Sequence, residues 1–400
     1  MNTLTKECVS CNICVKECAF LKKYGNPGTI AHDLSAGNLH ERISFECSLC
    51  GLCTSLCPKD IDPCAAFLGL RRKVFAATGE VLPEHRGILA YEKKGLSNRF
   101  SLCKLPKACS TVFFPGCTFT GTRAARTKQV YAWLRQEIPN TGIVLDCCTK
   151  PSHDLGRDVF FNTHFSAMEN FLVGNGVQKV ITACPNCYKV FSTYAQKLKT
   201  ESIYEILAEK GLMTTGKISG RVTIHDPCVT RFETGLHDSV RKLVKDQGLK
   251  IKEMEHCREK TTCCGEGGSA FSVTPDLASA WRKRRENEAG NNRIITYCAG
   301  CCTFLGKSVQ TDHILDLLFE PEKTMDGSVK TSIPPFTYLA RINLKRKFKK
   351  KNREEIVAKD HSTMTHSKKV KFFKILTLIT LAFLVAGYAK TDWVSLLFNP

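Results

Sequence analysis

The segment VITACPNC at residues 180–187 recurs further along the chain as IITYCAGC at residues 294–301. In each segment a short run rich in β-branched residues leads into a Cys-x-x-Cys motif, Cys184 with Cys187 and then Cys298 with Cys301. Runs of this kind predict buried strands that end at a turn. Each segment therefore predicts a pair of thiols held at the end of a buried strand.

The cysteines that precede these two segments also repeat in the same order. Cys117 and the pair Cys147-Cys148 come before the first segment, and Cys228 and the pair Cys263-Cys264 come before the second. Five cysteines in one order at nearly constant separations indicate an internal duplication. Each copy also supplies more thiolates than the four that one structural zinc ion needs.

Further apolar runs at 111–114, 143–145 and 222–224 predict strands that end at or just before these cysteines, whereas the approach to Cys263 is less regular. Helical stretches such as 123–138 and 271–288 lie between the strands. Alternating strands and helices predict parallel sheets with right-handed crossovers, and ligands of such sheets gather at the carboxyl ends of the strands. We therefore expect each copy to carry its five cysteines at one edge of its own small α/β unit.

This five-cysteine pattern resembles the CCG domain, the cysteine-rich module of heterodisulfide reductase and its relatives, over about residues 110–320. The second copy has the full Cys-Cys-Gly at 263–265, whereas the first has Thr149 at the third position. The resemblance implies one or two noncubane [4Fe-4S] clusters. The set it implies to be catalytic is Cys228, Cys263, Cys264, Cys298 and Cys301, and its pair is Cys117, Cys147, Cys148, Cys184 and Cys187. A structural zinc in one of the two sets is a weaker alternative.

A second cysteine pattern occupies the N-terminal region. Its eight members are Cys8, Cys11, Cys14, Cys18, Cys47, Cys50, Cys53 and Cys57, and Pro58 follows the last of them. This spacing is typical of two cubane [4Fe-4S] clusters, in which the fourth cysteine of each run reaches the neighbouring cluster. Cys57 is therefore expected to join Cys8, Cys11 and Cys14, and Cys18 to join Cys47, Cys50 and Cys53. Two zinc ribbons are disfavoured, because they usually need only two Cys-x-x-Cys pairs for each metal.

The long interval between the two runs makes this region similar to the α-helical ferredoxin module. That module occurs in the iron–sulfur subunits of anaerobic glycerol-3-phosphate dehydrogenase, glycolate oxidase and succinate dehydrogenase. The remaining cysteines, expected as buried free thiols, are Cys64, Cys103, Cys109, Cys257 and Cys302, with a redox role for Cys302 as the alternative. His153 and His225 lie near ligand positions, where a structural hydrogen bond is favoured over proton delivery.

The charge and the first residues exclude two other classes of protein. The formal charge is +20, but residues 341–374 alone carry 13 Lys or Arg against three acidic residues. Metal-bound thiolates lower the net charge further, and no nucleic-acid-binding motif accompanies the basic stretch, so we expect no nucleic-acid partner. A disulfide framework fits poorly, because the chain is long and residues 1–9 lack the apolar core of a secretory signal.

The basic stretch leads into an apolar segment that predicts a single transmembrane helix at 370–390. Its length suits the hydrocarbon thickness, Lys371 and Lys374 can reach the headgroups, and Trp393 suits the far interface. An in-plane helix and a buried soluble helix are the alternatives. The positive flank predicts a cell-membrane protein that is anchored to lipid and keeps its iron–sulfur domains on the cytoplasmic side.

These expectations combine into an α+β multidomain protein. Its expected parts are a two-cluster ferredoxin-like domain (1–75), a linker (76–110), two CCG domains (111–220 and 221–320), a basic linker (321–369), a transmembrane helix (370–390) and a tail (391–400). No flavin- or nucleotide-binding motif is recognisable, so a flavoprotein or quinone-reactive partner is expected.

Two functions remain open at this point. The first is a heterodisulfide-reductase-like enzyme that acts on a disulfide or thiol-type substrate. The second is an electron-transfer subunit between membrane quinone and a flavoprotein dehydrogenase of the lactate, glycolate or glycerol 3-phosphate class.

Overall fold

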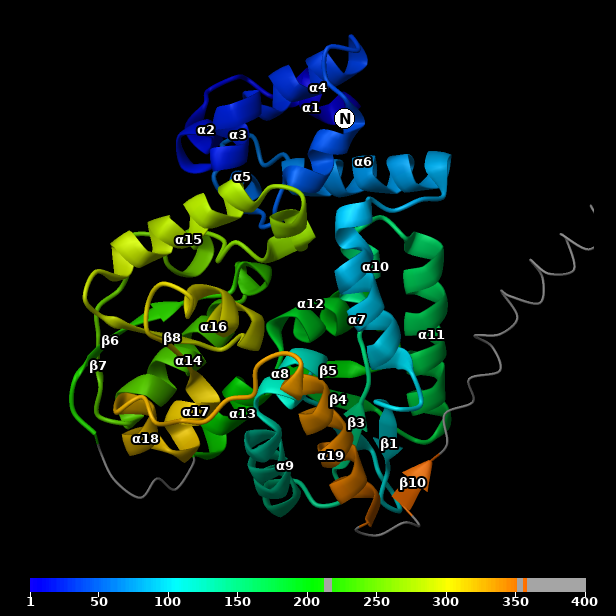
Figure 1. Ribbon diagram of the computed structural model, residues 1–400, viewed down its shortest axis with the longest axis vertical. Helices are drawn as coiled ribbons and strands as arrows, with labels where there is room; N and C mark the ends of the chain where they lie inside the picture. The colour runs from blue at the N-terminus through cyan, green and yellow to red at the C-terminus, as the bar shows by residue number, and fades with distance from the viewer. Residues whose placement is uncertain (212–217, 351–354, 358–400) are drawn as a thin grey trace, which may run out of the picture. The chain divides into compact units, whose positions relative to one another are not determined.

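The N-terminal region of the computed structural model is built from short helices around the cysteine loops (Figure 1). The structure describes residues 1–211, 218–350 and 355–357. The helices of this region are α1 (Asn2–Glu7), α2 (Ile13–Glu17), α3 (Ala19–Tyr24), α4 (Pro27–Ser35), the 3-10 helix η1 (Glu41–Glu46), α5 (Leu52–Ser55) and α6 (Pro63–Thr78). Asn26 and Asp62 cap α4 and α6 by accepting hydrogen bonds from Thr29 N and Ala65 N. The sequence had predicted an α-helical iron–sulfur module for this region, and the region is helical.

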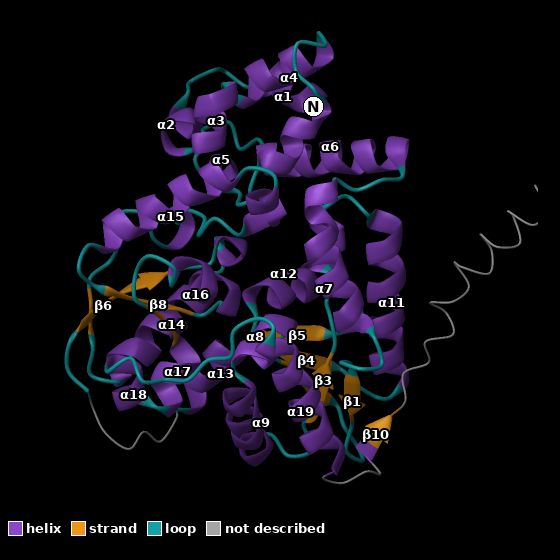
Figure 2. Ribbon diagram, in the orientation of Figure 1, coloured by secondary structure: helices purple, strands orange, loops and turns teal. Residues whose placement is uncertain are grey.

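Two sheets follow, one for each cysteine repeat (Figure 2). The first has the order β10-β1-β3-β2-β4-β5, and the second has the order β7-β6-β8-β9. The strands of the first sheet are β1 (Leu102–Lys104), β2 (Thr111–Phe114), β3 (Gly142–Leu145), β4 (Lys179–Thr182), β5 (Lys199–Ser202) and β10 (Ile356–Val357). Those of the second are β6 (Arg221–His225), β7 (Lys250–Ile251), β8 (Arg293–Thr296) and β9 (Thr311–His313). The expected strands at 111–114, 143–145, 180–182, 222–224 and 294–297 are confirmed to within one or two residues.

The pairing of the strands repeats between the two sheets. The strand before the lone cysteine lies beside the strand before Cys-x-x-Cys in both, with Phe113 opposite Ile181 and Ile224 opposite Ile295. These central pairs are parallel, as expected, and only β1, which lies between β3 and β10 in the first sheet, runs antiparallel to its neighbours. The strand β7 is only two residues long and ends well before Cys263, which explains the irregular approach to that cysteine.

Helices cover both sheets and connect their strands (Figure 1). Around the first sheet they are α8 (Cys117–Thr122), α9 (Ala124–Glu137), α10 (Lys150–Asp154), α11 (Asp158–Gly174), α12 (Pro185–Tyr194) and α13 (Ile203–Lys210). Around the second they are η3 (Cys228–Thr230), α14 (Thr234–Asp246), η4 (Arg258–Lys260), η5 (Gly267–Ser272), α15 (Pro275–Ala289), α16 (Ala299–Leu305), α17 (Ile314–Phe319) and α18 (Pro321–Met325). The expected helices 123–138 and 271–288 correspond to α9 and to η5 with α15.

One hydrophobic core joins the two repeats. Ile181 of β4 and Ile295 of β8 belong to the same buried cluster, and α13 packs against α14 between the sheets. The hydroxyl oxygen of Tyr204 lies 2.6 Å from the carbonyl oxygen of Ala183 and 2.8 Å from that of Tyr297. Those two residues immediately precede Cys184 and Cys298, so a single buried side chain fixes the two Cys-x-x-Cys turns relative to each other.

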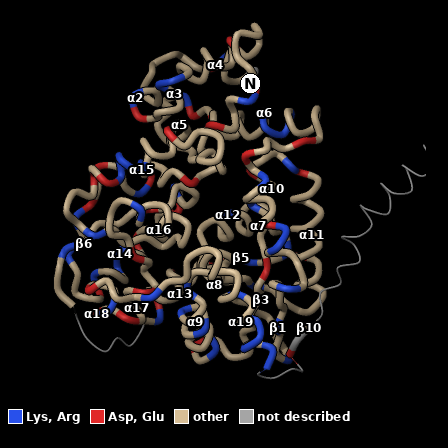
Figure 3. Tube along the Cα trace, viewed as in Figure 1, with Lys and Arg blue, Asp and Glu red and all other residues tan. Residues whose placement is uncertain are grey.

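The two expected linkers contain regular structure instead. Residues 76–110 include η2 (Pro83–His85), α7 (Arg86–Leu96) and β1. Residues 321–357 include α18, α19 (Phe336–Lys350) and β10, which pairs with β1. The basic helix α19 packs against α8 and α9 and buries Leu344 and Phe348 together with Arg341 and Lys345, while its other Lys and Arg residues are exposed (Figure 3 marks all of them blue).

No helix in the described part of the chain is long and apolar enough to cross a membrane. The expected transmembrane helix at 370–390 lies outside the described residues.

Candidate metal centres and active site

The structure divides the eight N-terminal cysteines between two small pockets. One pocket is lined by Cys8, Cys11, Cys14 and Cys57, together with Cys53. The other is lined by Cys18, Cys47, Cys50 and Cys53, together with Cys64. The structure thus brings together the two expected sets of four, with Cys53 between the pockets. Cys64 was expected as a free buried thiol, and its place in the second pocket was missed because it follows the cysteine run on the first turn of α6.

The thiols of these pockets suit a metal centre. Burial, with nearby cysteines adding to it, raises the pKa of Cys18 and of Cys47 to about 12. Thiols with such pKa values stay protonated at neutral pH unless a cation compensates the thiolate charge, which is what bound iron does. All 23 cysteines lie in the described residues and none forms a disulfide. Four thiols facing one pocket therefore fit a cubane cluster.

The first repeat places its cysteines at the ends of β2, β3 and β4. Cys117 opens α8, and Cys187 lies in the first turn of α12, where its Sγ is 3.5 Å from Sγ of Cys148. A hydrogen bond from Cys147 lowers the pKa of Cys117 to about 6, and the nearby guanidinium of Arg341 acts in the same direction. Gly116 has φ +86°, and a Cβ there would lie 2.6 Å from Cβ of Cys184, so the turn needs glycine.

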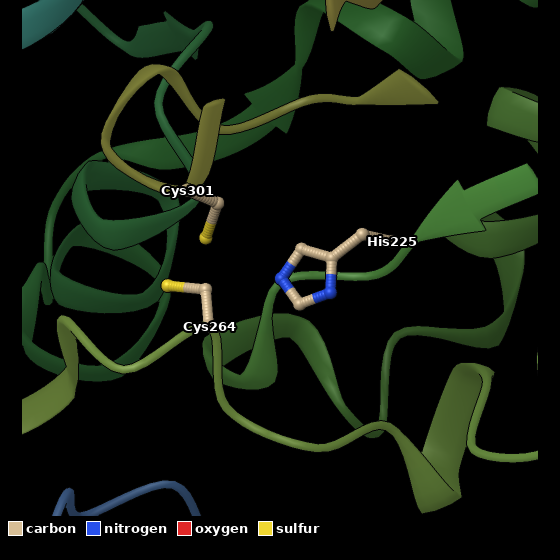
Figure 4. A group of neighbouring side chains, drawn as sticks. All are labelled: His225, Cys264 and Cys301. Atoms are coloured by element: carbon tan, nitrogen blue, oxygen red, sulfur yellow. The ribbon is translucent and has the colours of Figure 1, made fainter. Parts of the chain in front are cut away.

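The second repeat places its cysteines at the ends of β6 and β8 and in the loop before η5. Gly265 N donates a hydrogen bond to Cys263 Sγ at 3.2 Å, as a thiolate ligand in a Gly-rich turn would accept. Hydrogen bonds from Cys228 and Cys264 hold the pKa of Cys263 well below its usual value. In Figure 4, His225 points toward Cys264 and Cys301.

The two histidines near the cysteine sets, His153 and His225, differ in their hydrogen bonds. His153 has the expected structural hydrogen bonds, with Nδ1 2.9 Å from Asp154 and Nε2 2.6 Å from Tyr194. The expectation for His225 was wrong: neither ring nitrogen has a hydrogen-bond partner among the described residues. Burial lowers the pKa of His225 to about 3, so its ring is neutral. Cys302 is buried between Arg123 and the carbonyl oxygen of Thr311, which agrees with a structural thiol.

Both repeats open on one cavity of about 140 Å³. Nine of the ten repeat cysteines line it, namely Cys117, Cys147, Cys148, Cys184, Cys187, Cys228, Cys264, Cys298 and Cys301. Each α/β unit carries its cysteines at one edge of its own sheet, as expected. The two cysteine-bearing edges also face the same cavity, which was not predicted, because the shared core and Tyr204 hold the two sheets in a fixed arrangement.

The rest of the cavity wall is mixed in character. Ile88 and Phe271 supply apolar surface, and Asn186 reaches across from the first repeat to within 4.0 Å of Cys298 Sγ in the second. Lys150 and Asp154 form an ion pair of 2.7 Å in the wall, and burial raises the pKa of the Glu266 carboxyl to about 7. The cavity therefore offers thiol-rich walls, apolar surface and few free charges.

The N-terminal module contacts both repeats through its second pocket. Arg71 is fully buried and donates to the carbonyl oxygens of Cys47 at 2.6 Å, Gly268 at 2.7 Å and Asp154 at 2.8 Å. A Cβ on Gly267 would lie 2.6 Å from the carbonyl oxygen of Ser48 and 3.0 Å from Cys263 Sγ. The Cys47–Cys53 loop therefore lies directly against the second cysteine set.

Comparison with known protein families agrees with this arrangement. A 4Fe-4S dicluster domain matches residues 7–62, and a cysteine-rich CCG domain matches residues 222–306. The chain is an iron–sulfur redox protein. Its two matched domains contain the eight N-terminal cysteines and the second five-cysteine set.

Several similar proteins are redox enzymes or their subunits. A fumarate reductase (CoM/CoB) subunit of Methanothermobacter marburgensis is 24% identical over 78% of this chain and 69% of its own length. A dihydromethanophenazine:CoB–CoM heterodisulfide reductase subunit of Methanosarcina barkeri is 23% identical over 74% of this chain and 86% of its own. The EtfAB:quinone oxidoreductase of Syntrophomonas wolfei is 21% identical over 66% of this chain, which spans 43% of that protein.

Proposed function

We propose that this iron–sulfur protein interconverts a disulfide and two thiols in the cavity between its two cysteine sets. The observation that carries the proposal is the facing of both sets onto one cavity of about 140 Å³. The same thiols would hold the clusters, and the cavity wall extends beyond them to Ile88 and Phe271, which are not ligands and offer apolar surface to a substrate. The similar heterodisulfide reductase subunit supports this reaction class.

The proposed path of electrons follows the contacts between the modules. The pocket of Cys8, Cys11, Cys14 and Cys57 includes the exposed Cys11, so it suits entry from a redox partner. The buried pocket of Cys18, Cys47, Cys50 and Cys53 lies against the second cysteine set through Gly267 and Arg71. Electrons would therefore pass from the first pocket through the second to Cys228, Cys263, Cys264, Cys298 and Cys301, the proposed catalytic set.

The proposed reduction of a disulfide is a two-electron, two-proton reaction. Iron–sulfur clusters supply electrons one at a time. In the reductive direction one S–S bond breaks, two electrons and two protons are taken up, and two thiols leave. The protein's own part is to hold the two sulfur atoms between the cysteine sets and to keep bulk water out, for which Ile88, Phe271 and the paired Lys150–Asp154 supply the walls.

The second candidate function is an electron-transfer subunit between a flavoprotein dehydrogenase and membrane quinone. The similarity to an EtfAB:quinone oxidoreductase favours it. Membrane anchoring through residues 370–390, with the iron–sulfur domains on the cytoplasmic side, belongs to either function and remains part of the proposal. A flavoprotein or quinone-reactive partner is proposed in both cases.

Filling the cavity separates the two functions. Ile88→Trp places a large side chain into the cavity from α7 without removing a thiol. Val159→Trp, at a position that is 81% exposed, is the matched control. With anaerobic full-length protein, reduced viologen and a panel of small disulfides, we expect Ile88→Trp to lose disulfide reduction while viologen still reduces the N-terminal clusters. Wild-type protein without activity toward disulfides, or equal activity in both variants, would count against the disulfide proposal. Unimpaired transfer from flavoprotein to quinone in Ile88→Trp would then favour the electron-transfer function.

A further inference from the structure

His225 ends strand β6 with its ring in the second cysteine set. The residue is 0% exposed, and neither ring nitrogen has a hydrogen-bond partner among the described residues. A buried imidazole without a partner is costly, because each desolvated polar atom loses its hydrogen bonds to water. The buried His85 and His237 also lack partners for both ring nitrogens among the described residues, so the surroundings of His225 decide whether a metal could bind it.

The surroundings of His225 are two thiols with the geometry of a metal site. A ring nitrogen of His225, Sγ of Cys264 and Sγ of Cys301 all lie within 4.8 Å of one another (Figure 4). The three residues come from three separate segments: the end of β6, the loop before η5 and the first turn of α16. One metal ion bound at about 2.0–2.3 Å from each donor would fit among atoms at these separations.

The first cysteine set has no counterpart of this imidazole. His225 precedes Cys228 by three residues, and the residue three before Cys117 is Phe114. Phe114 also ends its strand, is fully buried and packs on Phe191 with ring centroids 5.1 Å apart. The duplicated fold therefore presents an apolar ring to one cysteine set and a nitrogen donor to the other.

We propose that His225 is a nitrogen ligand of the metal centre in the second cysteine set, so that this centre is bound by imidazole and thiolate while the first is bound by thiolate alone. The inference rests on the proposed presence of an iron–sulfur cluster in that set. A neutral imidazole has one lone-pair nitrogen and adds no negative charge, unlike a thiolate. In iron–sulfur centres, a histidine that takes the place of a thiolate ligand raises the reduction potential, and His225 would take the place of one of the five thiolates of the second set. His225 would therefore make the second centre easier to reduce than the first, at the place where the N-terminal module delivers electrons.

The direct test is an anaerobic crystal structure of the iron-loaded full-length protein with data at the iron edge. A ring nitrogen of His225 at about 2.0–2.2 Å from an iron atom would establish the ligand. Iron in the second set with both ring nitrogens more than about 3 Å away would overturn the inference but leave the iron–sulfur assignment intact. A second set that holds zinc, or no metal, would overturn both, so the two failures are distinguishable.

The matched variants are His225→Phe and His237→Phe. The first gives the second set the aromatic residue of the first set, and the second removes an equally buried histidine of α14 that is not in the group with Cys264 and Cys301. We expect His225→Phe either to lower the reduction potential of the second centre in a spectroscopic redox titration or to lose that centre's iron. His237→Phe should keep both properties. A His225→Phe protein with full iron content and an unchanged potential would contradict the inference.

Discussion

The guanidinium of Arg231 donates hydrogen bonds from Nε and Nη2 to the carbonyl oxygen of Cys50, at 3.1 and 3.0 Å. The two residues are 181 positions apart and belong to the second repeat and the N-terminal module. Arg231 is buried and also donates to the carbonyl oxygens of Glu259 and Thr261. One side chain therefore ties the ligand loop of the second cubane pocket to the loop that leads to Cys263 and Cys264.

Replacing Arg231 by Met should weaken that junction. The change leaves the carbonyl oxygens of Cys50, Glu259 and Thr261 without this donor, and the bond to Thr261 is buried, so the free energy of unfolding should fall by on the order of 3 kcal/mol. We expect a lower melting temperature and slower reduction of the second cysteine set by pre-reduced N-terminal clusters, measured by anaerobic stopped-flow. Lys283→Met, at an exposed position on α15, is the control. Equal melting temperatures for the two variants would contradict this role of Arg231.

The iron content follows from the four cysteine sets. Two cubanes and two noncubane clusters of four iron atoms each give about sixteen iron atoms per chain. Metal analysis of anaerobically purified protein checks this number. A content of only about eight iron atoms would contradict the assignment of noncubane clusters. Two zinc atoms in their place would indicate structural zinc sites.

Cys264→Ser should disturb the second repeat centre and leave the N-terminal clusters intact. Serine offers a harder and less acidic ligand, so iron–sulfur coordination weakens. Disulfide reduction should collapse, while reduction of the N-terminal clusters by an artificial donor persists, as followed by their visible absorbance. Cys148→Ser in the first repeat is the internal comparison. The role of the second repeat as a working redox centre would be falsified by Cys264→Ser protein that keeps full turnover with its physiological donor and acceptor.

Glu92 should make the stability of the fold depend on pH. Burial raises the pKa of this carboxyl to about 7 from an ordinary 4.5, although Ser152 donates to it. The folded state therefore binds a proton more tightly than the unfolded state, and stability falls as pH rises between about 4.5 and about 7. The difference across this window is about 3 kcal/mol. Glu92→Gln should remove it, so the variant's melting temperature relative to wild type should rise from pH 5 to pH 8. A difference that does not change with pH would contradict this assignment.

Deleting residues 371–400 should give a protein that leaves the membrane fraction and keeps its clusters. All the expected ligands lie at or before Cys301, and the described fold ends at Val357. Iron content and sedimentation of the truncated chain check both halves of this expectation. Continued sedimentation with membranes would show that a partner subunit, and not the deleted segment, provides the anchor.

Much of the fold could be predicted from local sequence. The runs before Cys117, Cys184, Cys228 and Cys298 form strands where they were expected, because β-branched residues between turn residues leave few other conformations for a buried segment. The less regular approach to Cys263 was also correctly noted, since β7 ends early. The helices at 86–96 and 336–350, inside the expected linkers, were not predicted, because their basic residues hid the faces that they bury.

The sequence by itself determined the grouping of the thiols, because Cys-x-x-Cys turns and runs of close cysteines bring donors together through local geometry. Only the tertiary structure decided how the groups meet. Both five-cysteine sets line one cavity, His225 lies beside Cys264 and Cys301, and Arg231 reaches Cys50. These contacts join residues far apart in the chain, and their positions follow from packing of the shared core around residues such as Tyr204, which local spacing does not encode.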